Sequence, residues 1–534
     1  MQNITIKTVT PAVLKSWLHD GNEIALLDVR EHGEYGEAHL FYVVSTPYSK
    51  LEAEAARMVK RKKVRIVLVD EDGGELAHNA AQKLIAQKYQ TIYILQGGVQ
   101  GWKKAGYELF AGVNLPSKTF GELAEHAFDT PRITALELNE KIQRGDDLVV
   151  LDGRPYTEFK KMSIPTAICC PNGELPLRID ELVSSDDTTI VINCAGRTRS
   201  IIGAQTLINL GIKNKVLALE NGTQGWYLAD LQLDHGKTKR HALEIDSATL
   251  KNKQLRATAL AKKHEVATVD IATVRQWLND AQRTTFLCDV RTPEEFAQGS
   301  LPGAQNTPGG QLVQATDQYV AVKGARLVVF DSEGVRAPAM ASWLAMLGWE
   351  VAVLDNALSD HSLIENKTEL MPGTALEKIS SAEIKKSINS NPCLFDLRPS
   401  MKYREAHIEQ AHWATRAKIG KALNGKMPEC VILLADDLIV ARLFAMDLKS
   451  AGVKNIHLNM DSPSQWEAEG LTVVATPGFP ADQECIDYLF FVHDRHDGNK
   501  AAARQYLAWE MNLLAQIDEQ ERNSYRLPHD HAHS

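Results

Sequence analysis

Short apolar runs that each end in Asp-x-Arg recur four times along the chain. They are Leu26-Leu27-Asp28-Val29-Arg30, Val150-Leu151-Asp152-Gly153-Arg154, Leu287-Cys288-Asp289-Val290-Arg291 and Leu394-Phe395-Asp396-Leu397-Arg398. Apolar runs of this length predict buried strands. Each run follows a segment with helix-start chemistry, namely Thr10-Pro11, Thr134 with Glu137, Asp270, and Ser380 with Glu383. The pattern therefore predicts four copies of one helix and strand unit.

The segments after each run continue the repeat. An acidic, aromatic stretch comes first, then a second apolar run and a helical pattern. Gly-rich turns that end in tryptophan close the first two copies, at 97–102 and 222–226, while the fourth keeps only Trp466 and the third has Leu354-Asp355-Asn356 in that place. Strands that alternate with helices predict a parallel sheet in each copy.

The connecting segments also have helical patterns. Residues 117–130 and 240–265 are predicted to be helical linkers, so we expect the domains to pack together. Residues 497–522 are predicted to form one helix that docks on the body of the protein or on a second subunit, with the apolar stripe Tyr506, Leu507, Trp509, Leu513, Leu514 and Ile517. The histidines at 529–533 could bind a metal, but we expect a frayed polar tail.

One cysteine lies where ligands bind in such sheets. Cys194 directly follows the predicted strand 189–192, and a helical pattern begins at Ile201. Backbone N–H groups and the helix dipole at this position attract an anion, and Arg197 and Arg199 add positive charge. We therefore expect Cys194 to be a thiolate nucleophile at neutral pH, although a small buried hydrophobic cysteine is the simpler alternative.

The length of the loop separates two kinds of chemistry. Protein tyrosine phosphatases use Cys-x5-Arg, but here Ser200 stands six residues after Cys194 and Arg199 stands five after it. The shorter loop resembles that of the rhodanese sulfurtransferases, which hold one extra sulfur on the cysteine. This one-residue difference favours sulfur over phosphate.

All four copies resemble rhodanese domains over about residues 5–475. The resemblance implies an α/β fold, with four tandem domains that are each a parallel sheet flanked by helices. The predicted parts are domain 1 (1–115), domain 2 (116–238, with Cys194), a helical linker (239–265), domain 3 (266–372), domain 4 (373–475) and a C-terminal helical tail (476–534).

The same resemblance implies a thiosulfate sulfurtransferase that works through a Cys194 persulfide. Its expected partners are thiosulfate or a similar donor and a thiol or protein acceptor, with no cofactor and no metal. The substrate-binding residues are expected to be Arg197, Arg199, Arg154, Ala195, Gly196, Thr198 and Ser200. The alternative is a binding scaffold or sulfur carrier, in which domains 1, 3 and 4 recruit partners.

The other three loops have changed. Asp70 and Asp331 stand 42 residues after the first Asp of their copies, as Cys194 does, and the looser fit of domain 4 places Ala435 or Asp436 there. None of these residues can become a persulfide, so domains 1, 3 and 4 are predicted to be inactive. A carboxylate there can instead cap the following helix, or it can have a separate acid or ligand role.

Some candidates in domain 2 have a simpler structural interpretation. Arg154 either binds the donor or pairs with Asp152, an arrangement that recurs in all four copies. Cys169 and Cys170 fit a buried core better than a redox pair. Glu174 could line the cleft, and we assign it no role.

Composition limits the remaining possibilities. The 534 residues predict three to four domains, and the net charge of −9 argues against nucleic acid as a general partner. The seven cysteines show no disulfide or metal-like spacing. The start of the chain lacks a signal peptide pattern, and no apolar run has the ~20 residues that cross a bilayer. We expect a cytoplasmic protein without membrane partners that could form a homo-oligomer.

Overall fold

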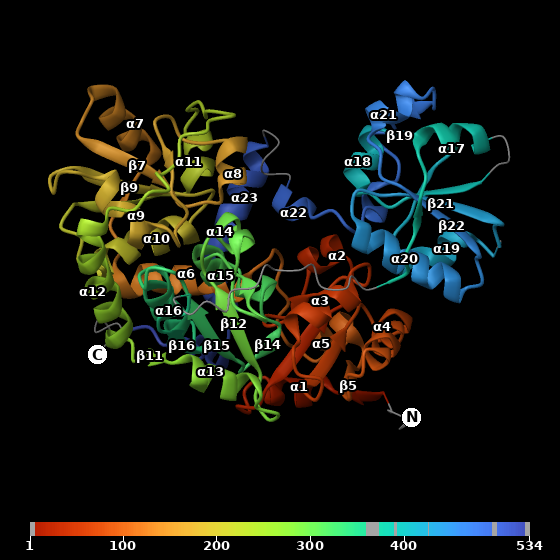
Figure 1. Ribbon diagram of the computed structural model, residues 1–534, viewed down its shortest axis with the longest axis horizontal. Coiled ribbons are helices and arrows are strands. Elements are labelled where there is room, and N and C mark those ends of the chain that lie inside the picture. Colours follow the sequence, from red (N-terminus) through yellow and green to blue (C-terminus); the bar gives the residue numbers. More distant parts are fainter. Residues whose placement is uncertain (1–5, 359–372, 389–391, 426, 494–498, 529–534) are drawn as a thin grey trace. The chain divides into compact units, whose positions relative to one another are not determined.

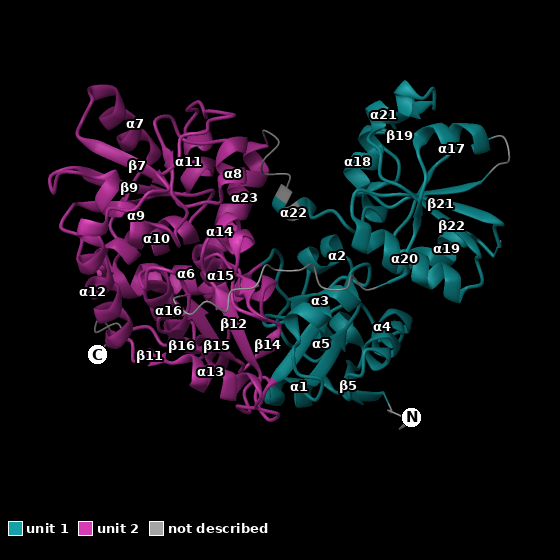
Figure 2. Cartoon of the chain, viewed as in Figure 1, with its two compact units in different colours: residues 1–17, 24–113, 368–492 teal, residues 18–23, 114–367, 493–534 magenta. Residues whose placement is uncertain are grey.

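The chain forms four parallel sheets with flanking helices (Figure 1). The computed structural model describes residues 6–358, 373–388, 392–425, 427–493 and 499–528. Two compact units divide the chain (Figure 2). The first consists of 1–17, 24–113 and 368–492, and the second of 18–23, 114–367 and 493–534. Domains 1 and 4 thus fall mainly in one unit, and domains 2 and 3 in the other.

Domain 1 has the strand order β1-β5-β4-β2, with β3 beside β2 and all pairs parallel. Its elements are β1 Lys7–Val9, α1 Pro11–Trp17, β2 Ile24–Asp28, α2 His32–Glu37, β3 Val44–Ser45, α3 Leu51–Met58, β4 Arg65–Val69, α4 Glu75–Ala86, β5 Thr91–Leu95 and α5 Gly98–Lys104.

Domain 2 repeats this order as β6-β10-β9-β7-β8, again with parallel pairs. Its elements are α6 Leu115–Phe128, β6 Arg132–Ile133, α7 Ala135–Arg144, β7 Leu148–Asp152, α8 Tyr156–Lys161, β8 Ile168–Cys169, α9 Leu175–Leu182, β9 Thr189–Asn193, α10 Thr198–Asn209, β10 Val216–Leu219 and α11 Gly222–Leu228. The strand that leads to Cys194, β9, is therefore the central one.

Domain 3 has the order β11-β16-β15-β12-β13. Its elements, with the preceding helix, are α12 Ser247–Lys263, β11 Ala267–Val269, α13 Ile271–Leu278, β12 Thr285–Asp289, α14 Pro293–Gln298, β13 Gln305–Asn306, α15 Gly309–Gln314, η1 Thr316–Gln318, β14 Val322–Lys323, β15 Arg326–Phe330, α16 Arg336–Met346 and β16 Glu350–Leu354.

Domain 4 has the order β17-β22-β21-β18-β20, so the same topology occurs four times. Its elements are β17 Glu377–Lys378, α17 Ser381–Ser387, β18 Cys393–Asp396, α18 Ser400–Glu405, β19 His407–Ile408, β20 His412–Trp413, η3 Arg416–Lys418, α19 Ile419–Leu423, β21 Cys430–Leu434, α20 Leu438–Ser450, β22 Asn455–Asn459, α21 Pro463–Ala468 and β23 Val473–Val474. After it come η4 Asp482–Glu484, α22 Phe490–His493, α23 Lys500–Met511, α24 Leu513–Gln516 and α25 Glu519–Arg522.

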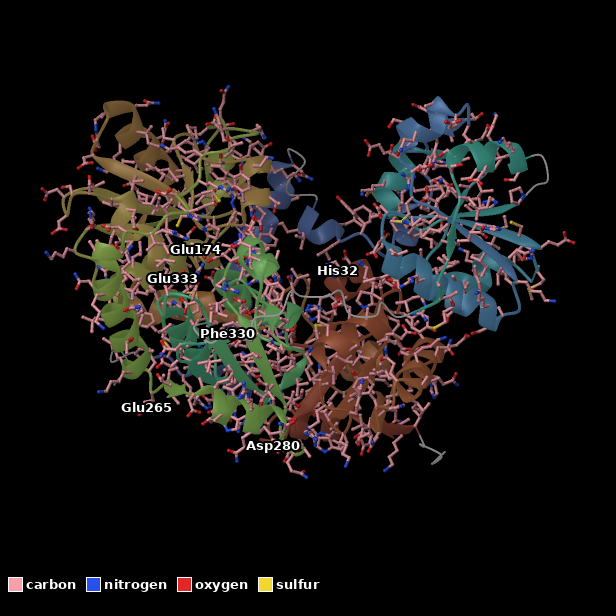
Figure 3. The ribbon with its side chains drawn as sticks, viewed as in Figure 1. His32, Glu174, Glu265, Asp280, Phe330 and Glu333 are labelled. Atoms are coloured by element: carbon pink, nitrogen blue, oxygen red, sulfur yellow. The ribbon has the colours of Figure 1, made fainter. Side chains whose placement is uncertain are left out.

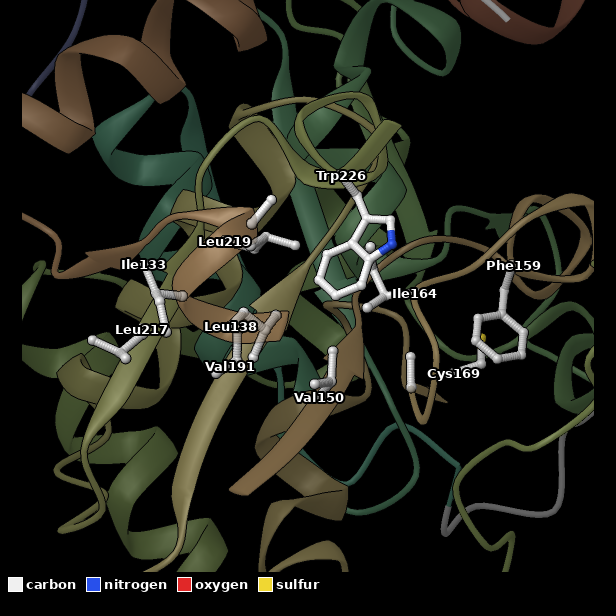
Figure 4. Packing of buried hydrophobic residues seen from close by; sticks show 12 residues of the cluster. Ile133, Leu138, Val150, Phe159, Ile164, Cys169, Val191, Leu217, Leu219 and Trp226 are labelled. Atoms are coloured by element: carbon white, nitrogen blue, oxygen red, sulfur yellow. The ribbon is translucent and has the colours of Figure 1, made fainter. Parts of the chain in front are cut away.

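Both faces of the domain 2 sheet are buried. Val150 and Val191 pack with Trp226 on one face (Figure 4), and the alternate residues Leu151 and Ile192 join a second apolar cluster. Side chains of a strand alternate between the two faces of its sheet, so continuous apolar runs suit a sheet with helices on both sides. This explains why the strands of the repeat are apolar throughout.

The predicted helix starts are confirmed at the capping boxes. Thr134 and Glu137 cap α7 reciprocally, and Ser380 and Glu383 cap α17 in the same way. The linker prediction for 117–130 is confirmed as far as Phe128, where α6 ends. The prediction for 240–265 is wrong in its first third. Residues 239–241 instead hydrogen-bond to Cys169 along β8, and α12 begins only after its cap Asp246.

The predicted single helix over 497–522 is wrong. Three short helices, α23, α24 and α25, occupy the described part of this segment. Ile517 has an extended backbone, and the Asp518 side chain caps α25 in a capping box with Glu521, which ends the preceding helix. The apolar stripe does dock on the body of the protein, because Tyr506, Leu507 and Leu513 are buried. The histidines at 529–533 lie outside the described residues.

Candidate functional site

Cys194 lies in the loop between β9 and α10, and only 2% of it is exposed. The first residues of α11 donate backbone hydrogen bonds to this loop. Thr223 N donates to the Cys194 carbonyl at 2.8 Å, and Gln224 N donates to the Ala195 carbonyl at 3.1 Å. Gly222 makes this approach possible, because it has a φ of +52° and any Cβ there would lie 2.3 Å from the Cys194 carbonyl oxygen. The Gly-rich turn therefore serves to position the cysteine loop.

Arg199 brings a fixed positive charge to the thiol. Its guanidinium makes two hydrogen bonds to Glu158, of 2.8 and 2.9 Å. Burial opposes the charge, but Glu158 and a Cys194 thiolate outweigh it and hold the pKa of Arg199 above its ordinary value. The acidic, aromatic stretch of the repeat thus provides the carboxylate that orients this arginine.

The second arginine of the loop points to other partners. Arg197 forms two hydrogen bonds with Glu122, of 2.8 and 2.9 Å, and pairs with Glu125. Both carboxylates belong to α6, the linker helix before domain 2. In the structure, Arg197 therefore anchors the loop to α6 through its ion pairs. The sequence predicts instead that its charge binds the anionic donor.

This anchor is expected to make the local stability depend on pH. Burial raises the pKa of Glu122 to about 7, against the opposing hydrogen bonds from Arg197. A carboxyl whose pKa is higher in the folded state stabilises the fold fully below pH 4.5, and this contribution is lost as the pH rises through about 7. We expect Glu122 to make folding about 1–3 kcal/mol less favourable at pH 8 than at pH 5.

Urea unfolding of the wild-type protein and of Glu122→Gln at both pH values checks this expectation. The glutamine resembles the protonated acid and cannot titrate, so the pH-dependent shift of the unfolding midpoint should shrink. Glu125→Gln serves as the matched control on the same helix and should keep most of the shift. An equal shift in the wild type and in Glu122→Gln would contradict the assignment.

The remaining loop residues, Ala195, Gly196, Thr198 and Ser200, are all buried. Thr198 Oγ1 donates to Glu510 of α23 at 3.2 Å, and the same carboxylate lies 3.5 Å from Lys118 Nζ of α6. The C-terminal segment therefore contacts the cysteine loop directly. Sequence reasoning missed Glu510, Lys118 and the two α6 glutamates, and the apolar stripe gave no indication of which surface α23 would cover.

Arg154 is placed in a structural pair. Its guanidinium binds both oxygens of Asp152, at 2.9 and 2.7 Å, and the carbonyl of Met162. Arg30, Arg291 and Arg398 bind the corresponding aspartates and carbonyls in the same way. The recurring Asp-x-Arg therefore fastens the end of each strand to the end of the next helix, which also explains its presence in domains with no cysteine in the loop.

Cys169 and Cys170 are buried in the core of domain 2. Burial raises the pKa of Cys169 to about 12 and raises that of Cys170 well above its ordinary value. Such thiols stay protonated at neutral pH and are poor nucleophiles. The structure favours a packing role for both.

The aspartates in the loops of domains 1 and 3 act as built-in anions. The Asp331 carboxylate accepts hydrogen bonds from the backbone N–H groups of Gly334, Val335 and Arg336, at 2.8 to 3.1 Å. Asp70 accepts from Gly73, Gly74 and Ala77 in domain 1. In both loops the carboxylate satisfies the helix N-terminus, as the capping interpretation predicts.

Domain 4 has a different solution. Its strand β21 ends at Leu434 and α20 begins at Leu438, and the cap is Asp437 rather than Ala435 or Asp436. Asp437 accepts hydrogen bonds from Ile439 N and Val440 N. The shorter loop leaves no room for the arrangement around Cys194.

Within the described residues, no three His, Cys, Asp or Glu side chains gather closely enough to hold a metal ion. Among the helices of that same part of the chain, none has both the length and the apolar character that crossing a membrane requires.

Comparisons with known proteins show which family this chain resembles. The Rhodanese-like domain model matches residues 10–105, 134–229 and 270–362, more than half of the chain. A crystal structure of thiosulfate sulfurtransferase from Pseudomonas aeruginosa is 38% identical, with a TM-score of 0.88 and coverage of 98% of this chain and 99% of that chain.

Curated relatives match single domains. Thiosulfate sulfurtransferase GlpE of Coxiella burnetii is 29% identical over 91 residues, which is 17% of this chain and 82% of the relative. Putative sulfur carrier protein YrkF of Bacillus subtilis is 31% identical over 103 residues, 19% of this chain and about half (54%) of the relative. With three matched repeats, four sheets of one topology and a nearly full-length structural relative, this chain belongs to the rhodanese-related sulfurtransferases.

Proposed function

We propose that the protein transfers a sulfane sulfur from thiosulfate, or a similar anionic donor, to cyanide or a thiol through a persulfide on Cys194. One observation supports this above the others. Cys194 directly follows the central strand β9 and stands just before the N-terminus of α10, as Asp331 follows β15 before α16. In the Asp331 loop, three backbone N–H groups donate to the carboxylate. The first N–H groups of a helix have no acceptor within the helix, so the position of Cys194 before α10 favours an anion such as a persulfide.

The reaction has two displacements. The Cys194 thiolate attacks the outer sulfur of thiosulfate, the S–S bond of the donor breaks, and sulfite leaves with the electron pair. Arg199 stabilises the negative charge during this step, while Glu158 keeps its guanidinium in place. The acceptor nucleophile then attacks the terminal sulfur, and Cys194 leaves as the thiolate. No net oxidation of the protein results.

The other three domains support a second role as a binding scaffold or carrier. Their loops hold a carboxylate or are too short, so they can fold and bind partners but cannot form a persulfide. A thiol or protein acceptor, a cytoplasmic location and a homo-oligomer are proposed from the sequence alone.

Steady-state turnover tests the proposal. The purified protein is expected to convert thiosulfate and cyanide to sulfite and thiocyanate, and to hydrolyse an aryl phosphate no faster than Cys194→Ser does. The reason is that the loop from Cys194 to Arg199 is one residue shorter than the Cys-x5-Arg loop that surrounds a phosphate. Cys194-dependent phosphate release would contradict the proposal. Absent turnover combined with stable capture of a partner protein would favour the scaffold.

A further inference from the structure

Domains 2 and 3 contact each other through equivalent residues. Gly310 lies 137 residues after Gly173, as Asp331 lies 137 after Cys194. A Cβ on Gly173 would lie 2.7 Å from Gly310 N, and a Cβ on Gly310 would lie 2.8 Å from Gly173 N. These reciprocal contacts indicate a pseudo-twofold axis between the two domains.

A second contact has the same symmetry. Trp343 Nε1 donates to Thr206 Oγ1 at 2.8 Å, and these two residues are again 137 positions apart. The helix contacts follow the same symmetry. Helix α16 of domain 3 packs against α9 of domain 2. Helix α10 of domain 2, the equivalent of α16, packs against α15 of domain 3, the equivalent of α9. A contact on one side of the axis therefore predicts its counterpart on the other.

The arginine of the domain 3 loop is surrounded by carboxylates. Arg336, the equivalent of Arg199, binds Glu295 of its own domain at 2.7 and 2.8 Å. It also binds Glu174 of domain 2 at 2.9 Å and pairs with Glu333 of its own loop. Glu174 and Glu333 are labelled in Figure 3. Its positive charge is thus fully used inside the protein.

Two of the three equivalent neighbours of Arg199 are not charged. Glu158 corresponds to Glu295, but Gly196 stands in the place of Glu333 and Gln311 in the place of Glu174. Gln311 lies in α15, which packs against α10, and Arg199 is in the first turn of α10. By the pseudo-symmetry, the neutral Gln311 of domain 3 stands toward Arg199 as the carboxylate of Glu174 in domain 2 stands toward Arg336.

We propose that Gln311 of domain 3 is a specificity-determining residue of the Cys194 site, because its neutral side chain leaves the charge of Arg199 available to an anionic donor. This inference rests on the proposed function for the identity of the donor, whereas the effect of residue 311 on the electrostatic potential at Arg199 does not depend on that function. Domain 3, which has no cysteine in its own loop, accordingly completes the site of domain 2. By the pseudo-symmetry, a carboxylate at this half-buried position would stand toward Arg199 as Glu174 stands toward Arg336, where charges are weakly screened.

The test replaces Gln311 by glutamate, which changes the charge and almost no volume. With Gln311→Glu, kcat/KM for thiosulfate is expected to fall about three- to tenfold. Gln311→Met removes the amide without adding charge and should stay within about twofold of the wild type. Gln276→Glu, at an exposed position of α13, controls for net charge and should also stay there.

Alkylation of Cys194 gives a second measurement that does not depend on sulfur transfer. The rate with anionic iodoacetate, divided by the rate with neutral iodoacetamide, reports the local potential. This ratio should fall about three- to tenfold in Gln311→Glu and remain unchanged in the two controls. A normal iodoacetamide rate shows that the loop is intact.

The outcomes separate the two proposals. An unchanged ratio in Gln311→Glu, or an equal fall in Gln311→Met, would overturn the role of Gln311 even if the wild type transfers sulfur. A fallen ratio in a protein that takes no sulfur from thiosulfate would support Gln311 while the proposed function fails.

Discussion

Thiosulfate is expected to add one sulfur atom to the wild-type protein at Cys194, and cyanide is expected to remove it. The Cys194→Ser variant should gain none. The expected effect is complete loss, because Asp70 and Asp331 occupy the equivalent positions in domains 1 and 3 and a carboxylate cannot carry a persulfide. Intact-protein mass spectrometry followed by peptide mapping measures both the mass gain and its position.

Cys288→Ser provides the matched control for this experiment. Cys288 is fully buried within strand β12 of domain 3, so its removal should leave the sulfur gain unchanged. Burial also raises the pKa of Cys169 and Cys170, which makes both poor nucleophiles. Sulfur found on Cys169 or Cys288 instead of Cys194 would overturn the assignment of the nucleophile.

Replacement of Arg154 by alanine is expected to destabilise domain 2 by about 3–5 kcal/mol. Arg154 is 2% exposed and Asp152 is 0% exposed, so the variant leaves a carboxylate buried without its partner. Asn193 would still donate to Asp152, but one amide cannot replace a guanidinium. Native-state hydrogen exchange of β7 and β9 measures the loss within the domain.

Arg291→Ala in domain 3 separates a structural role of Arg154 from donor binding. Arg291 makes the same contacts with Asp289 and the Gly299 carbonyl, in a domain whose loop has no cysteine. If the pair is structural, both variants should lose similar stability, each in its own domain. If the Arg154→Ala protein instead has wild-type stability and a raised KM for thiosulfate, Arg154 binds the donor.

Short-range chemistry explains why much of the fold could be predicted. A strand ends where an apolar run ends, and a helix begins where a Ser or Thr cap meets a Glu three residues on, so both signals lie within a few residues. Because the unit is repeated, each of these signals occurs in four copies of the sequence. The position of Cys194 at the carboxyl end of a central strand follows from the same local rules, because parallel strands place their ligand sites there.

Only the tertiary structure decided which partners the polar and charged residues of the Cys194 loop and of the equivalent domain 3 loop have. Arg197 pairs with α6, Thr198 with Glu510 of the C-terminal segment, and Arg336 with Glu174 of the neighbouring domain. These partners lie 72 to 312 residues apart in the chain, and no periodic pattern links them. An ion pair forms wherever packing brings two charges together, so local sequence identifies the arginines of a site but does not determine which of them remains available to a substrate.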